Sequence, residues 1–250
     1  MERTHGESIR LKGRDAFWTV AVIDPLVVPL VRRLVPYSRV TPNGLTCASF
    51  VLATASAVAF AFDQLVAGAI VVQLAFWLDC MDGKLASARE QPNPLGGLFD
   101  GIADALRITM NGIGLVIATP AGSELAPAAL IAFVGMRFAL ASLSEARPNK
   151  REPTFATVPM RLGPVLRAAR GRAAPPVSTV ELELLVFTIA PLAGHTAIAV
   201  GALAAAAVES VLFGRYVLHT AREARRLRAA EPGLHSQGAA GESARAHDHG

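Results

Sequence analysis

Apolar segments of about the length of a membrane-spanning helix follow one another along this chain, and they restrict its fold more than any other feature. There are six, covering residues 42–62, 65–82, 95–119, 126–144, 179–194 and 197–218. A helix needs about 20 mainly apolar residues to cross the hydrocarbon core of a bilayer. Only 18% of the 250 residues are charged, whereas soluble domains average about 25%. The sequence therefore predicts an all-α polytopic membrane protein with six transmembrane helices.

The apolar stretch before the first predicted span has a different pattern. Residues 16–35 are interrupted by Asp24, Pro25 and Pro29, and these residues disfavour a continuous transmembrane helix. We expect an N-terminal helix that lies in the membrane interface, with Trp18 at the level of the lipid headgroups. A short tilted span is the alternative.

The same hydropathy pattern divides the chain into one domain and two tails. Residues 1–15 are polar and are expected to form an N-terminal tail, whereas residues 16–228 form a single membrane domain. Residues 229–250, which are rich in Gly, Ala, Ser and His, are predicted to be disordered. The two cysteines, Cys47 and Cys80, fall inside predicted helices and form no disulfide framework.

The positions of the basic residues predict how the domain is oriented. The connections at 62–64, 119–126 and 192–196 contain no lysine or arginine, whereas the connection at 145–178 is strongly basic. By the positive-inside rule, both termini and the 145–178 connection face the cytoplasm, and we expect a multi-pass protein of the cell membrane. The net charge of +4 and the pI of about 9.6 then reflect topology and anionic headgroups. No nucleic-acid partner is expected.

Four aspartates occur at fixed intervals in otherwise apolar sequence: Asp79 and Asp82, then Asp100 and Asp104. The second and third spans form an antiparallel hairpin closed by the breaker sequence EQPNP at 90–94. Both pairs therefore lie at a similar depth, on the cytoplasmic side. Spacings of i, i+3 and i, i+4 place each pair on one helix face. Carboxylates at such positions are costly and usually functional.

Four crowded carboxylates require counter-charge. Lys84, Arg89 and Arg107 are too few, and too far to one side, to neutralise them. Sets made only of carboxylates suit hard divalent cations, and two such ions can hold a phosphoryl group between attacking and leaving oxygens. We expect two Mg²⁺ or Mn²⁺ ions. The alternative is that the aspartates are helix caps and surface acids.

This stretch resembles the signature of the CDP-alcohol phosphotransferase family, D-x2-D-G-x2-A-R-x8-G-x3-D-x3-D. Every interval is kept, and the matching positions are Asp79, Asp82, Gly83, Ala86, Ser87, Gly96, Asp100 and Asp104. The segment TPNGLT at 41–46 also resembles the start of that family's first core span. The resemblance extends over the helical core.

The resemblance implies a transferase of phospholipid biosynthesis. It would move a phosphatidyl, or phosphoryl-linked, group from a CDP-alcohol such as CDP-diacylglycerol to an alcohol acceptor, releasing CMP. Asp79, Asp82, Asp100 and Asp104 would hold the two metals, and Asp104 would also take the acceptor's proton. The residues implied in substrate binding are Asn43, Thr46, Gly83, Ala86, Ser87, Asn93 and Gly96. A homodimer is also implied.

One position departs from the family pattern, because Ser87 stands where the family has arginine. Arg89 is about 200° further around a regular helix and cannot simply replace it. A bidentate phosphate contact is therefore lost or supplied by another helix. The alternatives left open are the same chemistry on a non-lipid CDP or CMP donor, and a cation-binding transporter.

Other charged residues fall in or beside the predicted spans. Arg107, Arg137 and Glu209 lie in mid-span. Their similar depth predicts an ion pair between Arg137 and Glu209, with Arg107 as a competing partner. The functional alternative is that the arginines line the acceptor pocket. Glu181 and Glu183 open the fifth span, where negative charge is favourable at a helix N-terminus.

Overall fold

The computed structural model describes residues 9, 11–90, 96–145, 158–159, 173–175 and 177–230. Within these ranges, the side chains of residues 96–100, 144–145, 158–159, 173–174, 223–224 and 226–230 are not described. Most of the predicted turn at 90–94, most of the 145–178 connection, and the predicted tail beyond Ala230 lie outside the described residues.

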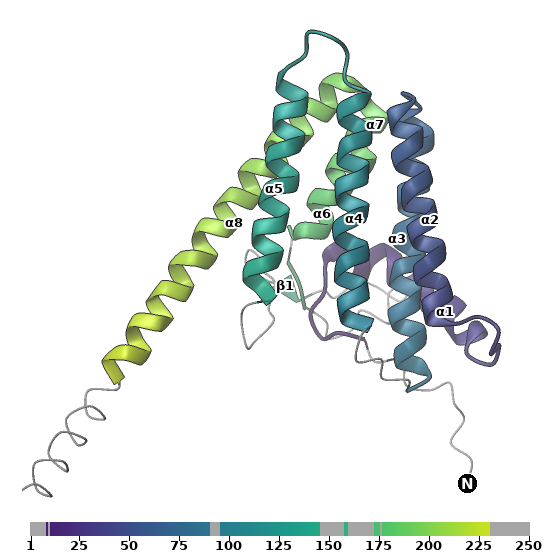
Figure 1. Ribbon diagram of the computed structural model, residues 1–250. Helices are drawn as coiled ribbons and strands as arrows, with labels where there is room; N and C mark the ends of the chain where they lie inside the picture. The colour runs from purple at the N-terminus through teal and green to yellow at the C-terminus, as the bar shows by residue number, and fades with distance from the viewer. Residues whose placement is uncertain are drawn as a thin grey trace, which may run out of the picture.

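The described chain is almost entirely helical (Figure 1). A π-helical segment, η1 (Thr19–Ile23), runs directly into helix α1 (Asp24–Leu34). Four long helices follow: α2 (Pro42–Ala61), α3 (Leu65–Ala88), α4 (Gly96–Ile117) and α5 (Leu125–Glu145). The two-residue strands β1 (Val158–Pro159) and β2 (Ala173–Ala174) pair antiparallel. The last helical elements are α6 (Thr179–Leu184), the π-helical η3 (Leu185–Ile189), α7 (Ala190–Ala193) and α8 (His195–Ala230).

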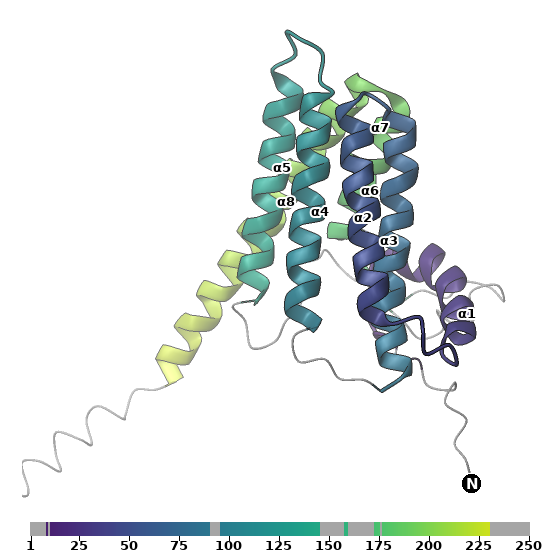
Figure 2. The ribbon, with the colours of Figure 1, turned by 45° about the vertical axis from the view of Figure 1, so that its right-hand side comes forward.

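Helices α2 to α5 stand side by side, and α8 crosses the bundle and continues beyond it (Figures 1 and 2). Helix α2 packs against both α3 and α4, while α5 packs against α4 and α8. Phe60, Phe133 and Phe187 are almost completely buried at the centre of this arrangement. The rings of Phe133 and Phe187 meet edge to face, with 5.9 Å between their centroids.

Four described helical segments are long and apolar enough to cross a membrane: Pro42–Ala61, Leu65–Ala88, Leu125–Leu143 and His195–Arg222. The prediction of a membrane protein built from helices is confirmed to that extent. Helix α4 covers the third predicted span and lies between α2 and α5 in the bundle (Figure 1). The fifth predicted span is divided into α6, η3 and α7. The full set of six spans remains a prediction.

Helix starts in the chain follow local capping chemistry. The Thr41 side chain accepts a hydrogen bond from the Gly44 N–H at 3.0 Å, and Pro42 occupies the first position of α2. Ser178 and Glu181 form a capping box at the start of α6. The Glu181 carboxylate also accepts a hydrogen bond from the Trp18 N–H at 2.8 Å. The prediction that Glu181 favours a helix start is therefore confirmed, and its carboxylate also holds the N-terminal segment.

The long helices are joined by small residues and hydroxyl groups. The Ser49 hydroxyl of α2 donates to the Ala75 carbonyl of α3 at 2.9 Å, and the Ser56 hydroxyl donates to Asn111 Oδ1 of α4 at 2.7 Å. A Cβ atom on Gly114 would lie 2.4 Å from the Ala57 carbonyl oxygen. Small residues and buried hydroxyls of this kind allow close helix approach where lipid surrounds the bundle.

The N-terminal helix α1 packs on the end of α3. Val27 and Val31 of α1 join Met81 and Leu85 of α3 in a small apolar cluster. On its outer side, Leu26 is 51% exposed, so α1 has one apolar face on protein and another facing outwards. Trp18 is partly buried, and its Nε1 atom is buried without a hydrogen-bond partner among the described residues. Its level relative to the lipid headgroups stays a prediction.

The connections without lysine or arginine lie together at the end of the bundle opposite the aspartates (Figures 1 and 2). His195 Nε2 and Asp63 Oδ1 are 2.8 Å apart and join the α2–α3 turn to the start of α8. The predicted hairpin of the second and third spans, which are α3 and α4, has its acidic residues at the other end of the bundle and is consistent with this arrangement.

The close approach of α2 and α4 can be tested at Gly114. Gly114→Ala should reduce the free energy of unfolding by about 1–3 kcal/mol, because the new methyl group meets backbone that cannot rotate away. Gly135→Ala is the matched control, since nothing lies within 4 Å of its Cβ position. The measurement is thermal unfolding in detergent, and equal melting temperatures for the two variants would contradict the packing described.

Candidate active site

A cavity of about 350 Å³ opens at the aspartate end of the bundle. Its walls come from the segment before η1 and the first residue of η1, the second half of α3, the middle of α4, one position of α5, and α6. The residues that line it are Leu11, Lys12, Asp15, Ala16, Thr19, Phe76, Asp79, Cys80, Asp82, Gly83, Lys84, Asp104, Arg107, Arg137, Val180 and Glu183. Chain segments far apart in sequence thus enclose one polar space.

Three of the four signature aspartates line this cavity. Asp79 and Asp82 lie one turn apart on α3, and Asp104 faces the same space from α4. Asp82 is 6% exposed, whereas the Asp104 side chain is 39% exposed. The Asp100 side chain is not described, although its backbone lies one helical turn before Asp104 in α4. Among the described side chains, no three acidic, His or Cys groups form a ready-made metal cluster.

The residues around Asp82 hold its carboxylate and leave space beside it. The Thr46 hydroxyl of α2 donates a hydrogen bond to Asp82 Oδ2. Gly83 also lines the cavity, and nothing lies within 4 Å of the position a Cβ would take. Thr46 therefore acts on Asp82 as an orienting neighbour, and Gly83 keeps the adjacent wall open.

The other residues implied in substrate binding lie elsewhere. Asn43 is exposed in the first turn of α2. Ala86 and Ser87 are partly buried on α3 and, in the described part of the chain, are not among the cavity-lining residues. Asn93 lies outside the described residues, and Gly96 begins α4. The structure thus brings Gly83 to the aspartates and places Thr46 behind Asp82.

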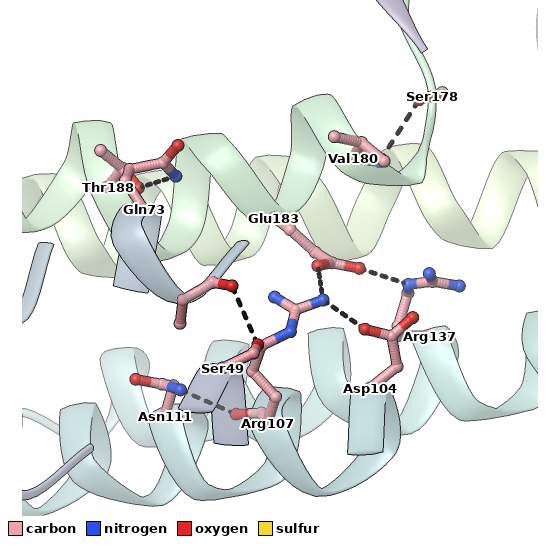
Figure 3. A network of polar contacts seen from close by, with 11 residues as sticks. Ser49, Gln73, Asp104, Arg107, Asn111, Arg137, Ser178, Val180, Glu183 and Thr188 are labelled. Atoms are coloured by element: carbon pink, nitrogen blue, oxygen red, sulfur yellow. Dashed lines mark hydrogen bonds and ion pairs between the residues drawn. The ribbon is translucent and has the colours of Figure 1, made fainter. Parts of the chain in front are cut away.

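Two arginines at the cavity share one carboxylate (Figure 3). Arg107 Nη2 lies 3.0 Å from Glu183 Oε2, and Arg137 Nε lies 3.0 Å from Glu183 Oε1. Arg107 Nη2 also contacts Asp104 Oδ1 at 2.8 Å. The side chains of Arg107 and Glu183 are each only 8% exposed. Glu183 therefore orients both arginines, and through Arg107 it reaches Asp104.

The predicted ion pair of Glu209 with Arg137 or Arg107 is not formed as a direct contact between described residues, although Arg137 lies near enough to attract the Glu209 carboxylate. Glu209 is completely buried on α8, but within the described part of the chain neither of its carboxylate oxygens has a hydrogen-bond partner. The arginines turn instead to Glu183, which lies between them in space. The prediction that Glu183 merely favours a helix start is also wrong, because its carboxylate is committed to these side chains. Similar depth along two helices does not fix which faces meet.

Two other basic residues near the aspartates have structural partners. Lys84 Nζ lies 3.0 Å from Asp24 Oδ1, and the side chain of Asp24, the first residue of α1, is fully buried. The Arg89 guanidinium donates to main-chain carbonyls of the α1–α2 connection at 2.6–3.3 Å: those of Leu34, Val35, Tyr37 and Val40. The sequence analysis considered Lys84, Arg89 and Arg107 as counter-charges for the aspartates. In the described structure, only Arg107 of these three contacts a signature aspartate.

The N-terminal segment was not anticipated as part of the site. Lys12, Asp15 and Thr19 line the cavity. The Glu181–Trp18 hydrogen bond and the Lys84–Asp24 ion pair hold this segment in place. The one available sequence signal was Asp24, a charge inside an apolar stretch, because such a charge needs a partner when buried.

The donor set fits a divalent cation. Asp79, Asp82 and Asp104 offer carboxylate oxygens to one open space, and hard cations such as Mg²⁺ and Mn²⁺ prefer oxygen ligands. The Thr46 hydroxyl already orients the Asp82 carboxylate. In metal sites, hydrogen bonds to the ligating side chains commonly have this role.

A model of the CDP-alcohol phosphatidyltransferase family matches residues 39–208, more than half of the chain. This protein belongs to that family. The matched region includes all four signature aspartates and all of α2 to α7. The resemblance noted in the sequence is thereby confirmed.

Two curated relatives are similar over part of their length. The "Bifunctional IPC transferase and DIPP synthase" of Rubrobacter xylanophilus is 37% identical over 105 residues, which are 39% of this chain and 24% of that protein. The "Inner membrane protein YnjF" of Escherichia coli is 31% identical over 117 residues, which are 45% of this chain and 56% of that protein. The matches thus span about a quarter and about half of these relatives.

Solved structures of the phosphatidylinositol phosphate synthase PgsA1 of Mycobacterium tuberculosis share the fold. The structure with CDP-DAG bound has a TM-score of 0.59 at 18% identity, covering 77% of this chain and 92% of that one. The complex with manganese and citrate has a TM-score of 0.58 at 19% identity, covering 77% and 87%. These likenesses support the fold of this chain.

Glu183 should contribute strongly to stability, because its loss leaves the buried guanidinium group of Arg107 and the partly buried one of Arg137 without their shared partner. Glu183→Gln should reduce the free energy of unfolding by about 3 kcal/mol, the cost typical of breaking a buried ion pair. Glu124→Gln, at an exposed position in the α4–α5 connection, is the control. Both are compared by thermal unfolding in detergent. A Glu183→Gln protein as stable as the control would contradict the described network.

Proposed function

We propose that the protein is an integral membrane transferase that moves a phosphatidyl, or phosphoryl-linked, group from a CDP-alcohol donor to an alcohol acceptor and releases CMP. The observation that carries this proposal is the cavity in which Asp79, Asp82 and Asp104 face one space beside Gly83. Membership of the CDP-alcohol phosphatidyltransferase family supports the reaction class. CDP-diacylglycerol is the proposed donor, in phospholipid biosynthesis.

The proposed metal ligands are Asp79, Asp82, Asp100 and Asp104, holding two Mg²⁺ or Mn²⁺ ions. When bound, such ions neutralise the donor's diphosphate and stabilise CMP as a leaving anion. The chain itself contributes oriented carboxylates, because Thr46 fixes Asp82 and Arg107 contacts Asp104. Gly83 lets the donor approach the α3 backbone, since it has no side chain on the cavity wall.

In the proposed reaction, the acceptor hydroxyl oxygen attacks the phosphorus that carries the donor's alcohol. A new P–O bond forms to the acceptor, and the bond from that phosphorus to the bridging oxygen breaks. CMP leaves with the bridging oxygen, and the acceptor's proton passes to Asp104. Asp104 suits this role because its side chain is 39% exposed, whereas Asp82 is only 6% exposed. Arg107 Nη2 holds the Asp104 carboxylate at 2.8 Å.

The proposed placement in the membrane follows the charge distribution. The aspartate cavity, both termini and the basic 145–178 connection would face the cytoplasm. Helices α2, α3, α4, α5 and α8 would span, with α6, η3 and α7 making the remaining crossing. Helix α1 would lie in the interface with Leu26 towards lipid, because that side chain is 51% exposed beside a helix face packed on α3. The proposal also includes a homodimer.

Release of CMP tests the reaction directly. Purified protein supplied with CDP-diacylglycerol, an alcohol acceptor and Mn²⁺ should release CMP, and Asp104→Asn should lower the rate by at least 100-fold, because the amide cannot take the acceptor's proton. Asp63→Asn, at the opposite end of the bundle, is the matched control. Unchanged CMP release by Asp104→Asn would exclude Asp104 as the base. A cation-binding transporter would instead move ions without releasing CMP.

Thr46 should affect metal affinity through Asp82. Thr46→Val keeps the shape of the side chain but removes the hydrogen bond to Asp82, and the Mn²⁺ concentration for half-maximal CMP release should rise about 10–100-fold. Thr54→Val is the control on the same helix, because the Thr54 hydroxyl bonds only within α2 and to Met110. If both variants show the same Mn²⁺ dependence, the Thr46 contact does not orient a metal ligand.

A further inference from the structure

The cavity contains several basic side chains, and they differ in what they can offer an anionic ligand. Arg107 is already bonded to Asp104 and Glu183, and Arg137 to Glu183. Arg89, the residue directly after α3, is bonded to four main-chain carbonyls and is not among the described cavity-lining residues. Lys84 has a different arrangement, because its anchor lies outside the cavity wall.

Lys84 lines the cavity directly after Asp82 and Gly83. Its ammonium group is anchored from behind by Asp24, which is 0% exposed and is not among the described cavity-lining residues. Besides this ion pair, Lys84 Nζ donates one hydrogen bond, to the Cys80 carbonyl at 3.3 Å. An ammonium group has three N–H donors. Asp24 and Cys80 thus hold the charge in place at the cavity wall, and a third donor can serve a ligand.

The position of Lys84 on α3 relates it to Ser87. Residues at i and i+3 lie on nearly the same helix face, so Lys84 is one turn before the place where the family signature has arginine. Arg89 is on a different face and is occupied. Lys84 can therefore place a positive charge on the face of α3 where Ser87 stands in place of the family's arginine.

We propose that Lys84, positioned by the buried Asp24, is the residue of α3 that binds the phosphates of the CDP-linked donor in place of the absent arginine. This inference rests on the proposed function, and it names a binding residue for the donor. Asp24 is a positioning residue, because it acts on the donor through Lys84. The geometry also gives α1 a direct role: the helix that packs on α3 carries the anchor of a phosphate-binding side chain.

The test must avoid leaving Asp24 as an unpaired buried charge. The double variant Asp24→Asn/Lys84→Met removes both charges together, so that loss of the fold does not obscure loss of binding. The control is Arg33→Met, which removes one positive charge from an exposed position of the same helix α1. Size exclusion and thermal unfolding in detergent first establish that each variant is folded.

Two measurements then examine the phosphate contact. In the double variant, the KM for CDP-diacylglycerol should rise about 10–100-fold while kcat falls less, as expected for a lost charge-assisted hydrogen bond. CDP should stabilise the wild-type protein against heat more than cytidine does, and the double variant should lose this difference. Adding Ser87→Arg to the double variant should restore both, because position 87 lies on the same helix face.

A folded double variant with the wild-type KM, or with the wild-type difference between CDP and cytidine, would overturn the proposal. If the double variant does not fold, Asp24→Asn/Lys84→Gln carries the same test, because the two amides can still form a hydrogen bond and neither carries a charge. The CDP measurement needs no turnover. Absence of CMP release by the wild-type protein would therefore refute the proposed function separately from the role of Lys84.

Discussion

The carboxylate of Glu183 accepts a contact from Arg107 on one oxygen and from Arg137 on the other, where α4, α5 and α6 meet. Burying charge in such a place is costly unless each charge has a partner. This requirement explains much of the arrangement around the cavity. Arg107 also forms an ion pair with Asp104. A second ion pair, between Lys84 and Asp24, attaches α1 to α3 beside the same cavity.

These pairs connect the packing of the bundle to the chemistry proposed for it. Close approach of α2 to α3 and α4 allows Thr46 to reach Asp82 and brings the ends of α3 and α4 together. The N-terminal segment closes the cavity because Glu181 holds Trp18 and Lys84 holds Asp24. Side chains that hold the structure together and side chains that would hold substrate are therefore immediate neighbours, and several belong to both groups.

The sequence was sufficient to predict the helices and the depth of the acidic residues. Hydropathy placed α2, α3, α4 and α5 within a few residues of their observed bounds, because each is a nearly continuous apolar segment. The intervals between the aspartates placed Asp79, Asp82 and Asp104 near one another, since helix geometry and the hairpin leave little freedom.

The partners of the buried charges could not be predicted in the same way. Helical periodicity states which residues share a face, but the choice between Glu183 and Glu209 depends on how α6 and α8 rotate against α5. That the N-terminal segment lines the cavity was not predicted, for a related reason. Its contacts with α3 and α6 join residues up to 163 positions apart in sequence, and no local pattern records them.

The central claim is that the four signature aspartates hold divalent ions in this cavity. An experimental structure of the protein in Mn²⁺, with anomalous scattering recorded at the manganese edge, tests it most directly. The account predicts two anomalous peaks about 3.5–4 Å apart, each within about 2.2 Å of carboxylate oxygens from Asp79, Asp82, Asp100 or Asp104. Manganese bound elsewhere, with the Asp79 and Asp104 side chains turned away from each other, would contradict it.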